Sequence, residues 1–246
     1  MIGLLAALSI FFTVTTHASE PPYGLPSGAV VIETKVVPRK WRANRAIIVW
    51  MLRPKKNPLA YGPEEYTCPD ETRGSYNSGP TRVSLVDTQT GKIINTVIVK
   101  EEEDKDTFDL PYKIRGSYYQ VPGVRKGAEG KPAIIALKDY NGDGKALEFA
   151  LFDAVACMGL QTTLYGYSQR QDRVIQYPIS LSINMGHHRS RVGRVWVDYL
   201  FSKTPTAPRY WKYEIDYRGR GGTLDKYEIR YDPQRERFDG TFNSEP

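Results

Sequence analysis

The sequence has few of the residues from which catalytic and metal centres are usually recognised. Its 246 residues include two cysteines and three histidines. His17 lies in the apolar N-terminal segment, and His187 and His188 are adjacent, so on a strand their side chains would face opposite sides. No His-Glu-x-x-His sequence and no closely spaced cysteine pair occurs, which excludes the common zinc motifs. The sequence therefore offers no recognisable zinc or histidine-based centre.

Motifs of serine hydrolases, phosphate-binding proteins and nucleic-acid-binding proteins are also missing. The nearest approach to a Gly-x-Ser-x-Gly nucleophile turn is Gly166-Tyr167-Ser168, which lacks the second glycine. No Gly-rich loop is followed by Lys and then Ser or Thr, as a P-loop requires. The net charge is +6, but the basic residues are spread along the chain and form no block. We therefore expect no nucleic-acid partner.

The one long apolar run lies at the N-terminus and is typical of a signal peptide. Ile2 to Val14 is almost wholly apolar, and Thr16 and Ala18 supply small residues for a cleavage site. The run is shorter than a transmembrane helix needs. We expect residues 1–18 to be a cleaved signal peptide of an exported protein, secreted or periplasmic, without a transmembrane segment after cleavage. An uncleaved anchor is the alternative, because no Lys or Arg precedes the apolar core.

Export would place the two cysteines in an oxidising compartment, where a pair is more often bridged than free. We therefore predict a disulfide between Cys68 and Cys157. Closing a loop of about 90 residues is worth roughly 4–5 kcal/mol in the chain-entropy model. A buried free Cys157, within an apolar segment, is the alternative.

Short runs of β-branched and aromatic residues recur along the chain, which contains 17 tyrosines. Residues 211–218 and 226–232 alternate strictly between apolar and charged side chains, as half-buried antiparallel strands do. Residues 82–86 and 93–99 flank a short polar turn, which predicts a hairpin. About a dozen short strands and no convincing helix of three turns predict an all-β protein, either an antiparallel β-sandwich or a partial propeller-like sheet assembly.

The strand pattern also suggests how the chain is organised. Residues 19–27 are rich in proline and are expected to form a flexible lead. Residues 28–246 are then expected to form a single all-β domain. A loop rich in Gly and Lys leaves a sub-boundary open near residues 120–132. No clean repeat of propeller-blade length is found, which counts against a full propeller.

One stretch, Asp139 to Glu148, has residue types and spacing that point to a particular chemistry. Asp139, Asn141 and Asp143 alternate, so a tight loop can turn three side-chain oxygens toward one point. The two intervening glycines permit the backbone angles of such a loop. Hard cations such as Ca²⁺ bind to oxygen ligands arranged in this way. The apolar runs 133–137 and 147–152 on either side predict a strand before the loop and a strand after it.

This stretch resembles the calcium loops of FG-GAP and VCBS repeats, which occur in integrin-type propellers and in many exported bacterial proteins. Asp139, Asn141, Asp143 and Gly144 match the first, third, fifth and sixth positions of that pattern. The family has Asp at the ninth position, where this chain has Leu147, and the nearest acid is Glu148 at the tenth. The resemblance implies a structural Ca²⁺ in a β context and implies no activity.

The candidate metal residues are therefore Asp139, Asn141, Asp143, Lys145 and Glu148. Lys145 is compatible with a bound cation only if its ammonium group points away from the acids. An EF-hand is excluded, because that loop needs Glu at its twelfth position, where Ala150 stands, and needs flanking helices. A metal-free turn is the alternative, because Asn-Gly and Asp-Gly are strong turn dipeptides.

Two functions of different classes remain open. The first is a non-enzymatic exported β-protein, steadied by Ca²⁺, that acts in binding or envelope structure, with a cell-envelope polymer or protein as its partner. The second is a secreted carbohydrate-active or other hydrolase that uses a pair of carboxylates. Glu148, Asp153 and Asp172 are among the acids that could serve, and the sequence selects no pair. Two carboxylates in an aromatic-lined cleft would favour the hydrolase.

Overall fold

The computed structural model describes residues 22–57, 72–73, 76–100, 107–110, 113–114, 117–118, 134–155, 159–185, 188–192, 195–196, 200 and 203–246. The predicted signal peptide at 1–18, Cys68, Cys157 and the sub-boundary at 120–132 lie outside these residues. The signal peptide, the disulfide and the boundary therefore stay predictions.

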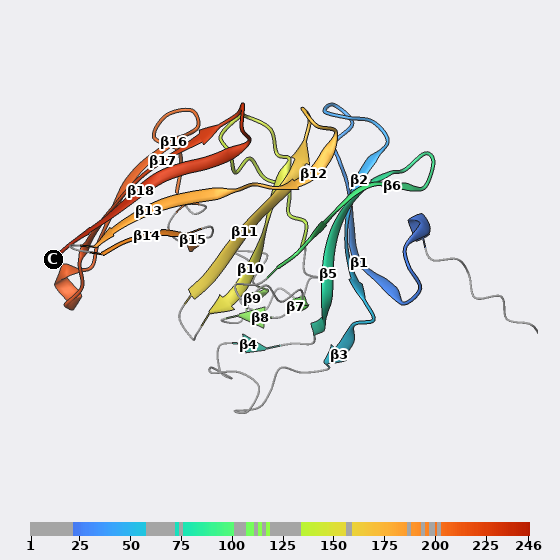
Figure 1. Cartoon of the computed structure of the whole chain (residues 1–246), viewed down its shortest axis with the longest axis horizontal. Coiled ribbons are helices and arrows are strands. Elements are labelled where there is room, and N and C mark those ends of the chain that lie inside the picture. The colour runs from blue at the N-terminus through green and yellow to red at the C-terminus, as the bar shows by residue number, and fades with distance from the viewer. Residues whose placement is uncertain are drawn as a thin grey trace, which may run out of the picture.

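The described chain is built almost entirely from β-strands, which form four sheets (Figure 1). Short 3₁₀ turns occur at Pro22–Gly24 and Arg218–Arg220, and the part of the chain that the structure describes contains no α-helix. The all-β prediction is thus confirmed. The strands are β1 (Ala29–Val36), β2 (Arg45–Leu52), β3 (Lys55–Asn57), β4 (Thr72–Arg73), β5 (Tyr76–Asp87), β6 (Lys92–Ile98), β7 (Thr107–Leu110), β8 (Lys113–Ile114), β9 (Ser117–Tyr118), β10 (Glu148–Val155), β11 (Gly159–Ser168), β12 (Arg173–Gln176), β13 (Ile179–Met185), β14 (His188–Val192), β15 (Val195–Trp196), β16 (Tyr210–Asp216), β17 (Leu224–Asp232) and β18 (Arg237–Glu245).

The first large sheet has six strands in the order β1-β2-β5-β3, with β6 and β7 also pairing with β5. Strand β2 begins with Arg45 and is apolar from residue 46 to residue 52, as expected for a strand that is covered on both faces. Ile47 and Val49 point into the main core, whereas Ile48 and Trp50 point to the opposite face. The β5–β6 hairpin is the one that the sequence predicts over residues 82–99.

A second, smaller core covers the outer face of this sheet. Leu25, which is 4% exposed, packs there with Ile48, Trp50 and Val86. The indole N–H of Trp50 donates to the Ser84 hydroxyl at 2.9 Å, so the polar atom of this buried ring is satisfied. Part of the segment that the sequence predicts to be a flexible lead, residues 22–27, is therefore held against the sheet.

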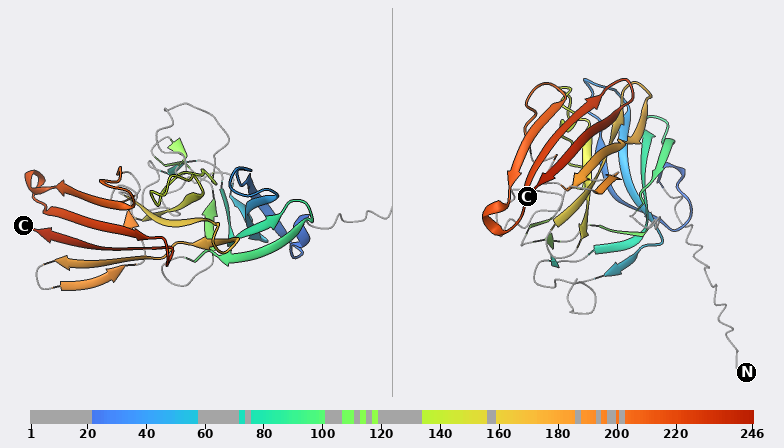
Figure 2. Two further views of the ribbon diagram at one scale, coloured as in Figure 1. Left: turned by 90° about the horizontal axis from the view of Figure 1, so that it is seen from above. Right: turned by 60° about the vertical axis from the view of Figure 1, so that its left-hand side comes forward.

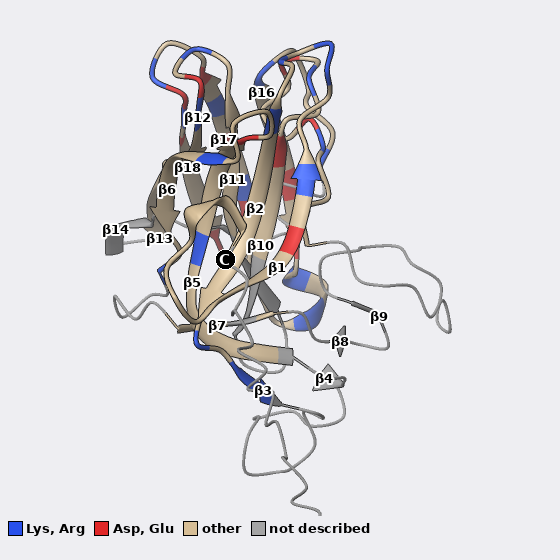
Figure 3. Cartoon of the chain, turned by 90° about the vertical axis from the view of Figure 1, so that its right-hand side faces the viewer, with Lys and Arg blue, Asp and Glu red and all other residues tan. Residues whose placement is uncertain are grey.

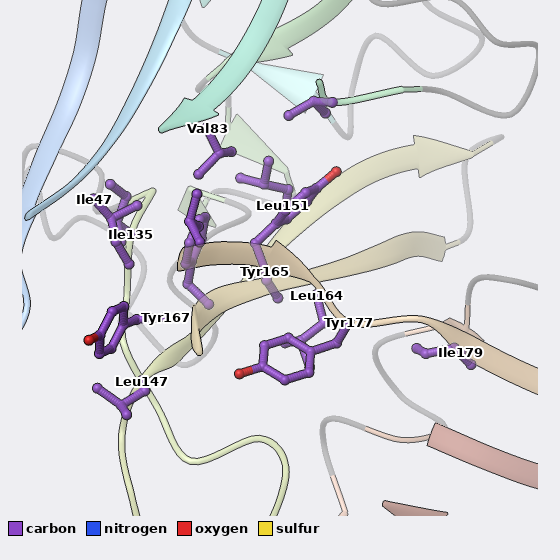
Figure 4. Packing of buried hydrophobic residues seen from close by; sticks show 14 of the residues in the cluster. Ile47, Val83, Ile135, Leu147, Leu151, Leu164, Tyr165, Tyr167, Tyr177 and Ile179 are labelled. Atoms are coloured by element: carbon purple, nitrogen blue, oxygen red, sulfur yellow. The ribbon is translucent and has the colours of Figure 1, made fainter. Parts of the chain in front are cut away.

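A four-stranded sheet, β10-β11-β12 with β15 beside β11, packs against the six-stranded sheet in a sandwich-like arrangement. Phe149 and Leu151 of β10 and Tyr165 of β11 are almost completely buried in the shared core. Figure 4 shows this core, in which Tyr177 turns its hydroxyl away from Ile179 and toward the side on which Leu147 lies.

The third sheet has five strands in the order β14-β13-β18-β17-β16 and extends away from the other two toward the C-terminus (Figure 2). Its β13–β18 pair is parallel, and its other pairs are antiparallel. The alternation in the sequence is confirmed, because Tyr227, Ile229 and Tyr231 are buried while Glu228 and Arg230 between them are exposed. Residues 217–223, between the two alternating segments, join β16 to β17.

The strand predicted at 133–137, before the acidic loop, is wrong. Residues 134–137 belong to no strand, although Ile134 and Ile135 are buried as their apolar character predicts. Their backbone N–H groups donate to the Glu33 carboxylate, at 2.6 Å and 3.1 Å, instead of to a neighbouring strand. A side chain from β1 therefore satisfies the hydrogen bonds that would otherwise require a sheet partner.

An ion-pair network connects the six-stranded sheet to the four-stranded sheet, at the end of the molecule that contains the β11–β12 turn. Arg45 of β2 contacts Asp87 at 2.7 Å and Asp172, in the β11–β12 turn, at 2.8 Å. Its side chain is only 13% exposed, and Asp172 also accepts the Tyr167 hydroxyl at 2.7 Å. Charged residues of both signs lie in the loops at this end of the molecule (Figure 3).

Gly166 in β11 provides a test of how closely the sheet packs under the acidic loop. A Cβ at Gly166 would lie 2.6 Å from the Leu147 carbonyl oxygen and 2.9 Å from the Glu148 Cα. We expect Gly166→Ala to lower the free energy of unfolding by about 1–3 kcal/mol, because backbone atoms must shift to admit the methyl group. Gly219→Ala is the matched control, because nothing lies within 4 Å of a Cβ there. Urea denaturation measures both, and equal stability of the two variants would contradict the packing.

Candidate functional site

The acidic loop lies between the buried pair Ile134 and Ile135 and the start of β10. Gly142 and Gly144 both have positive φ values, 72° and 86°, as a tight loop with glycines at these positions requires. A Cβ at Gly142 would lie 3.1 Å from the backbone nitrogen of Arg209, so the loop is also pressed against the segment that leads into β16.

The three alternating oxygen side chains point into the loop and hold it by accepting backbone N–H groups. The two oxygens of Asp139 accept from Asp143 at 3.1 Å and from Gly144 at 2.8 Å. The Asn141 side-chain oxygen also accepts from Asp143, at 2.9 Å, and Asp143 accepts from Lys145 at 2.9 Å. Each of these oxygens keeps a further acceptor position. The structure thus brings together the residues that the sequence pattern selects.

Glu148, the first residue of β10, is hydrogen-bonded to the loop. Its carboxylate accepts the Tyr140 backbone N–H at 3.1 Å, the Asn141 side-chain N–H at 3.1 Å and the Tyr177 hydroxyl at 3.4 Å. The residue is 1% exposed. Glu148 therefore joins the loop to β10 and to the segment between β12 and β13.

The environment of Glu148 disfavours its charged form. Burial raises the pKa of the Glu148 carboxyl from its ordinary value of 4.5 to about 8, against the opposing hydrogen bond from Tyr140. The charges of Asp143 and Asp139 raise this pKa further. Among the described residues, none of these three carboxylates has an ion-pair partner within 4 Å. The loop therefore concentrates negative charge that the described part of the protein does not neutralise by direct contact.

The ammonium group of Lys145, the nearest basic side chain in the loop, points away from these acids. Its Nζ donates to the Gln169 side-chain oxygen at 2.6 Å and lies 5.4 Å from the centre of the Trp41 ring. An ammonium group cannot ligate a cation, so Lys145 would contribute at most its backbone carbonyl. That carbonyl accepts the Leu147 N–H at 3.0 Å.

Whether these residues suit a metal depends on which donors they offer. In the part of the chain that the structure describes, no three His, Cys, Asp or Glu side chains gather closely enough to hold an ion. A cation in the loop would therefore need the Asn141 side-chain oxygen and backbone carbonyls in addition to Asp139 and Asp143. Such an oxygen-only donor set, with few carboxylates, suits Ca²⁺ and does not suit zinc.

A cleft of about 230 Å³ opens beside the loop. Two buried carboxylates line it, Glu148 at 1% exposure and Glu236 at 7%. Tyr167, Tyr177 and Tyr231 contribute to its walls, and the Tyr177 and Tyr231 rings lie 6.1 Å apart at 56°. Acidic and aromatic side chains from four separate segments therefore line the same cleft.

Sequence reasoning missed Glu236, which lies in the turn between β17 and β18. Its carboxylate accepts the Ser168 hydroxyl at 2.6 Å and the Gln171 side-chain N–H at 2.5 Å, and Arg170 lies 3.5 Å away. These three partners belong to the end of β11 and to the β11–β12 turn, far away in sequence. No local signal distinguishes Glu236 from an ordinary acid in a polar turn.

The other candidates from the sequence lie elsewhere. Asp172 accepts from Arg45 and Tyr167, and its hydrogen bond with Arg45 is the main reason that its pKa falls to about 2, so it anchors the sheets instead of acting as an acid. Asp153 and His188 lie on β10 and β14, and their side chains, like His187, fall outside the described residues.

Comparisons with known proteins identify no relative. No protein-family model, curated protein or solved structure matches the chain. Among the described residues, no helix is long and apolar enough to cross a membrane. The proposal of a function therefore depends on the loop and the cleft themselves.

The raised pKa of Glu148 predicts a specific dependence of stability on pH in the absence of metal. Between pH 4.5 and about 8 the folded protein holds this proton while the unfolded chain releases it. The free energy of unfolding should therefore fall as pH rises, with a slope of up to about 1.4 kcal/mol per pH unit. Glu148→Gln should remove this component, because the amide does not titrate.

Urea denaturation in the presence of a chelator, repeated across this pH range, measures the effect. Glu228→Gln is the matched control, because Glu228 is exposed on β17. The control should keep the pH dependence of the wild-type protein. A Glu148→Gln variant with the same pH dependence as the wild type would show that Glu148 is ionised in the folded protein throughout.

Proposed function

We propose that this chain is an exported, non-enzymatic β-protein that binds one structural Ca²⁺ in the loop 139–148 and acts in binding or envelope structure. The observation that carries the proposal is the uncompensated negative charge of the loop. Asp139 and Asp143 have no described basic partner, and their charges contribute to the raised pKa of Glu148 beside them. A divalent cation would supply the missing charge.

Two further features support a cation in this place. Asp139, Asn141 and Asp143 turn their oxygens into the loop at alternate positions, which is the arrangement of the FG-GAP and VCBS calcium loops. The Lys145 ammonium is held by Gln169, so it does not repel a cation from inside the loop.

A bound Ca²⁺ would act as a clamp. The loop is attached to β10 through Glu148 and pressed against the segment before β16 through Gly142. A cation bound to its oxygens would fix the relative positions of the four-stranded and five-stranded sheets. Such a clamp suits a protein that works outside the cell, where calcium is abundant and sites with dissociation constants of about 0.1–1 mM are filled.

Calcium should therefore raise the melting temperature of the protein. For a dissociation constant of this size, calcium at a concentration of about 1 mM contributes about 0.4–1.4 kcal/mol. This corresponds to a rise of about 1–6 °C for a chain of this length. Asp139→Ala combined with Asp143→Ala should abolish the shift. Thermal denaturation in calcium and in chelator measures it.

Two control variants separate charge from shape. Asp139→Asn with Asp143→Asn keeps oxygen acceptors for the loop N–H groups but removes the charge, and it should also lose the calcium shift. Glu214→Gln with Glu228→Gln removes two exposed charges from β16 and β17 and should keep it. Identical melting of the wild type in calcium and in chelator would refute the calcium site.

A carboxylate-pair hydrolase is the second candidate, and one observation favours it. Glu148 and Glu236 line the same cleft together with three tyrosines. At neutral pH Glu148, with a pKa of about 8, would carry a proton that a general acid could donate. Glu236, which accepts hydrogen bonds from Ser168 and Gln171, would be the second carboxylate.

A screen of glycan and ester hydrolysis tests this second candidate. An enzyme of this type should lose at least about a hundredfold in kcat when either Glu148→Gln or Glu236→Gln is introduced. Glu228→Gln again serves as the control. Turnover that persists in both cleft variants would come from elsewhere and would contradict the carboxylate pair.

A further inference from the structure

The cleft has properties that indicate what it could hold. Its volume of about 230 Å³ is below the roughly 300–1,000 Å³ of sites for drug-sized ligands. The cleft therefore has room for one small ring.

Ionisable side chains of both kinds line the cleft. Asp143, Glu148 and Glu236 are the acids, and Lys145, Arg170 and Arg209 are the bases. Two of the basic groups are engaged, since Lys145 donates to Gln169 and Arg170 contacts Glu236. An anion would meet the buried carboxylates, and a cation would meet the arginines. This balance favours a neutral ligand.

The lining combines strong hydrogen-bond acceptors with aromatic and apolar surface. By the count of donors among the described residues, Glu148 and Glu236 each keep an acceptor position open. Tyr177, Tyr231 and Leu147, each less than a tenth exposed, contribute small areas of ring and apolar surface to the lining. A ligand that matches this lining has hydroxyl groups on its rim and C–H groups on its faces.

The two carboxylates are also held in place before any ligand arrives. Ser168 and Gln171 fix Glu236, and the Tyr140 backbone and Asn141 fix Glu148. Because their side chains are already ordered, binding would cost little further conformational entropy. This is a common property of preformed ligand sites.

We propose that this cleft is a binding site for a single neutral saccharide unit, such as the end of a glycan chain, with Glu148 and Glu236 forming hydrogen bonds with its hydroxyl groups. The inference rests on the binding role proposed above and names its ligand class. It does not require a bound Ca²⁺, because the cleft walls are formed without one.

Titration calorimetry of the full-length mature protein with free neutral monosaccharides tests the site. We expect at least one of glucose, galactose, mannose and N-acetylglucosamine to bind, with a dissociation constant on the order of 1 mM for so small a ligand. Glucosamine and glucuronate, which carry a positive and a negative charge, should bind more weakly.

Two variants assign binding to the cleft. Glu236→Gln should weaken binding about tenfold or more, because a charge-assisted hydrogen bond is lost. Tyr231→Phe keeps the ring and removes the hydroxyl, so it tests the site even if Glu236→Gln folds poorly. Glu228→Gln, on the exposed face of β17, should bind as the wild type does.

The outcomes separate this inference from the calcium proposal. If no neutral monosaccharide binds, if only a charged one binds, or if Tyr231→Phe and a folded Glu236→Gln both bind as tightly as the wild type, the saccharide site is refuted. A calcium-dependent melting shift would remain intact in each of these cases. If saccharide binding persists in chelator and the melting temperature does not change with calcium, only the calcium site is refuted.

Discussion

The burial of one carboxylate, that of Glu148, is the constraint on which this end of the molecule depends. Taken out of water, it needs donors, and it receives them from the backbone of Tyr140, the side chain of Asn141 and the hydroxyl of Tyr177. These contacts connect the acidic loop, β10 and the segment between β12 and β13. The same burial raises the pKa of Glu148 to about 8, so the group that organises the loop is also sensitive to charge placed beside it.

The loop and the cleft share this group, and their two proposed ligands would act on it differently. A cation in the loop would favour the ionised carboxylate, whereas a sugar hydroxyl needs only a free acceptor position. Glu236 reaches the cleft from the β17–β18 turn, held by the β11–β12 turn, which Arg45 in turn fixes through Asp172. The site thus depends on how the three large sheets meet, and no single sheet contains it.

Sequence patterns predicted what is local and missed what is distant. Strict alternation located β16 and β17, and the positive φ values of Gly142 and Gly144 follow from the loop spacing. The strand expected at 133–137 was wrong, because Glu33 from a distant strand satisfies that backbone. Glu236 was missed for the same reason, since its partners are 65 to 68 residues away in sequence.

The central claim is that the loop binds calcium and that Glu148 loses its proton when the calcium ion binds. Calorimetric titration of calcium at neutral pH, repeated in buffers of different ionisation enthalpy, tests both parts together. Because the pKa of Glu148 is about 8 in the metal-free protein, binding should release a large fraction of one proton. Glu148→Gln should bind without this release. Absence of binding at millimolar calcium, or binding with no proton release from the wild type, would contradict the account.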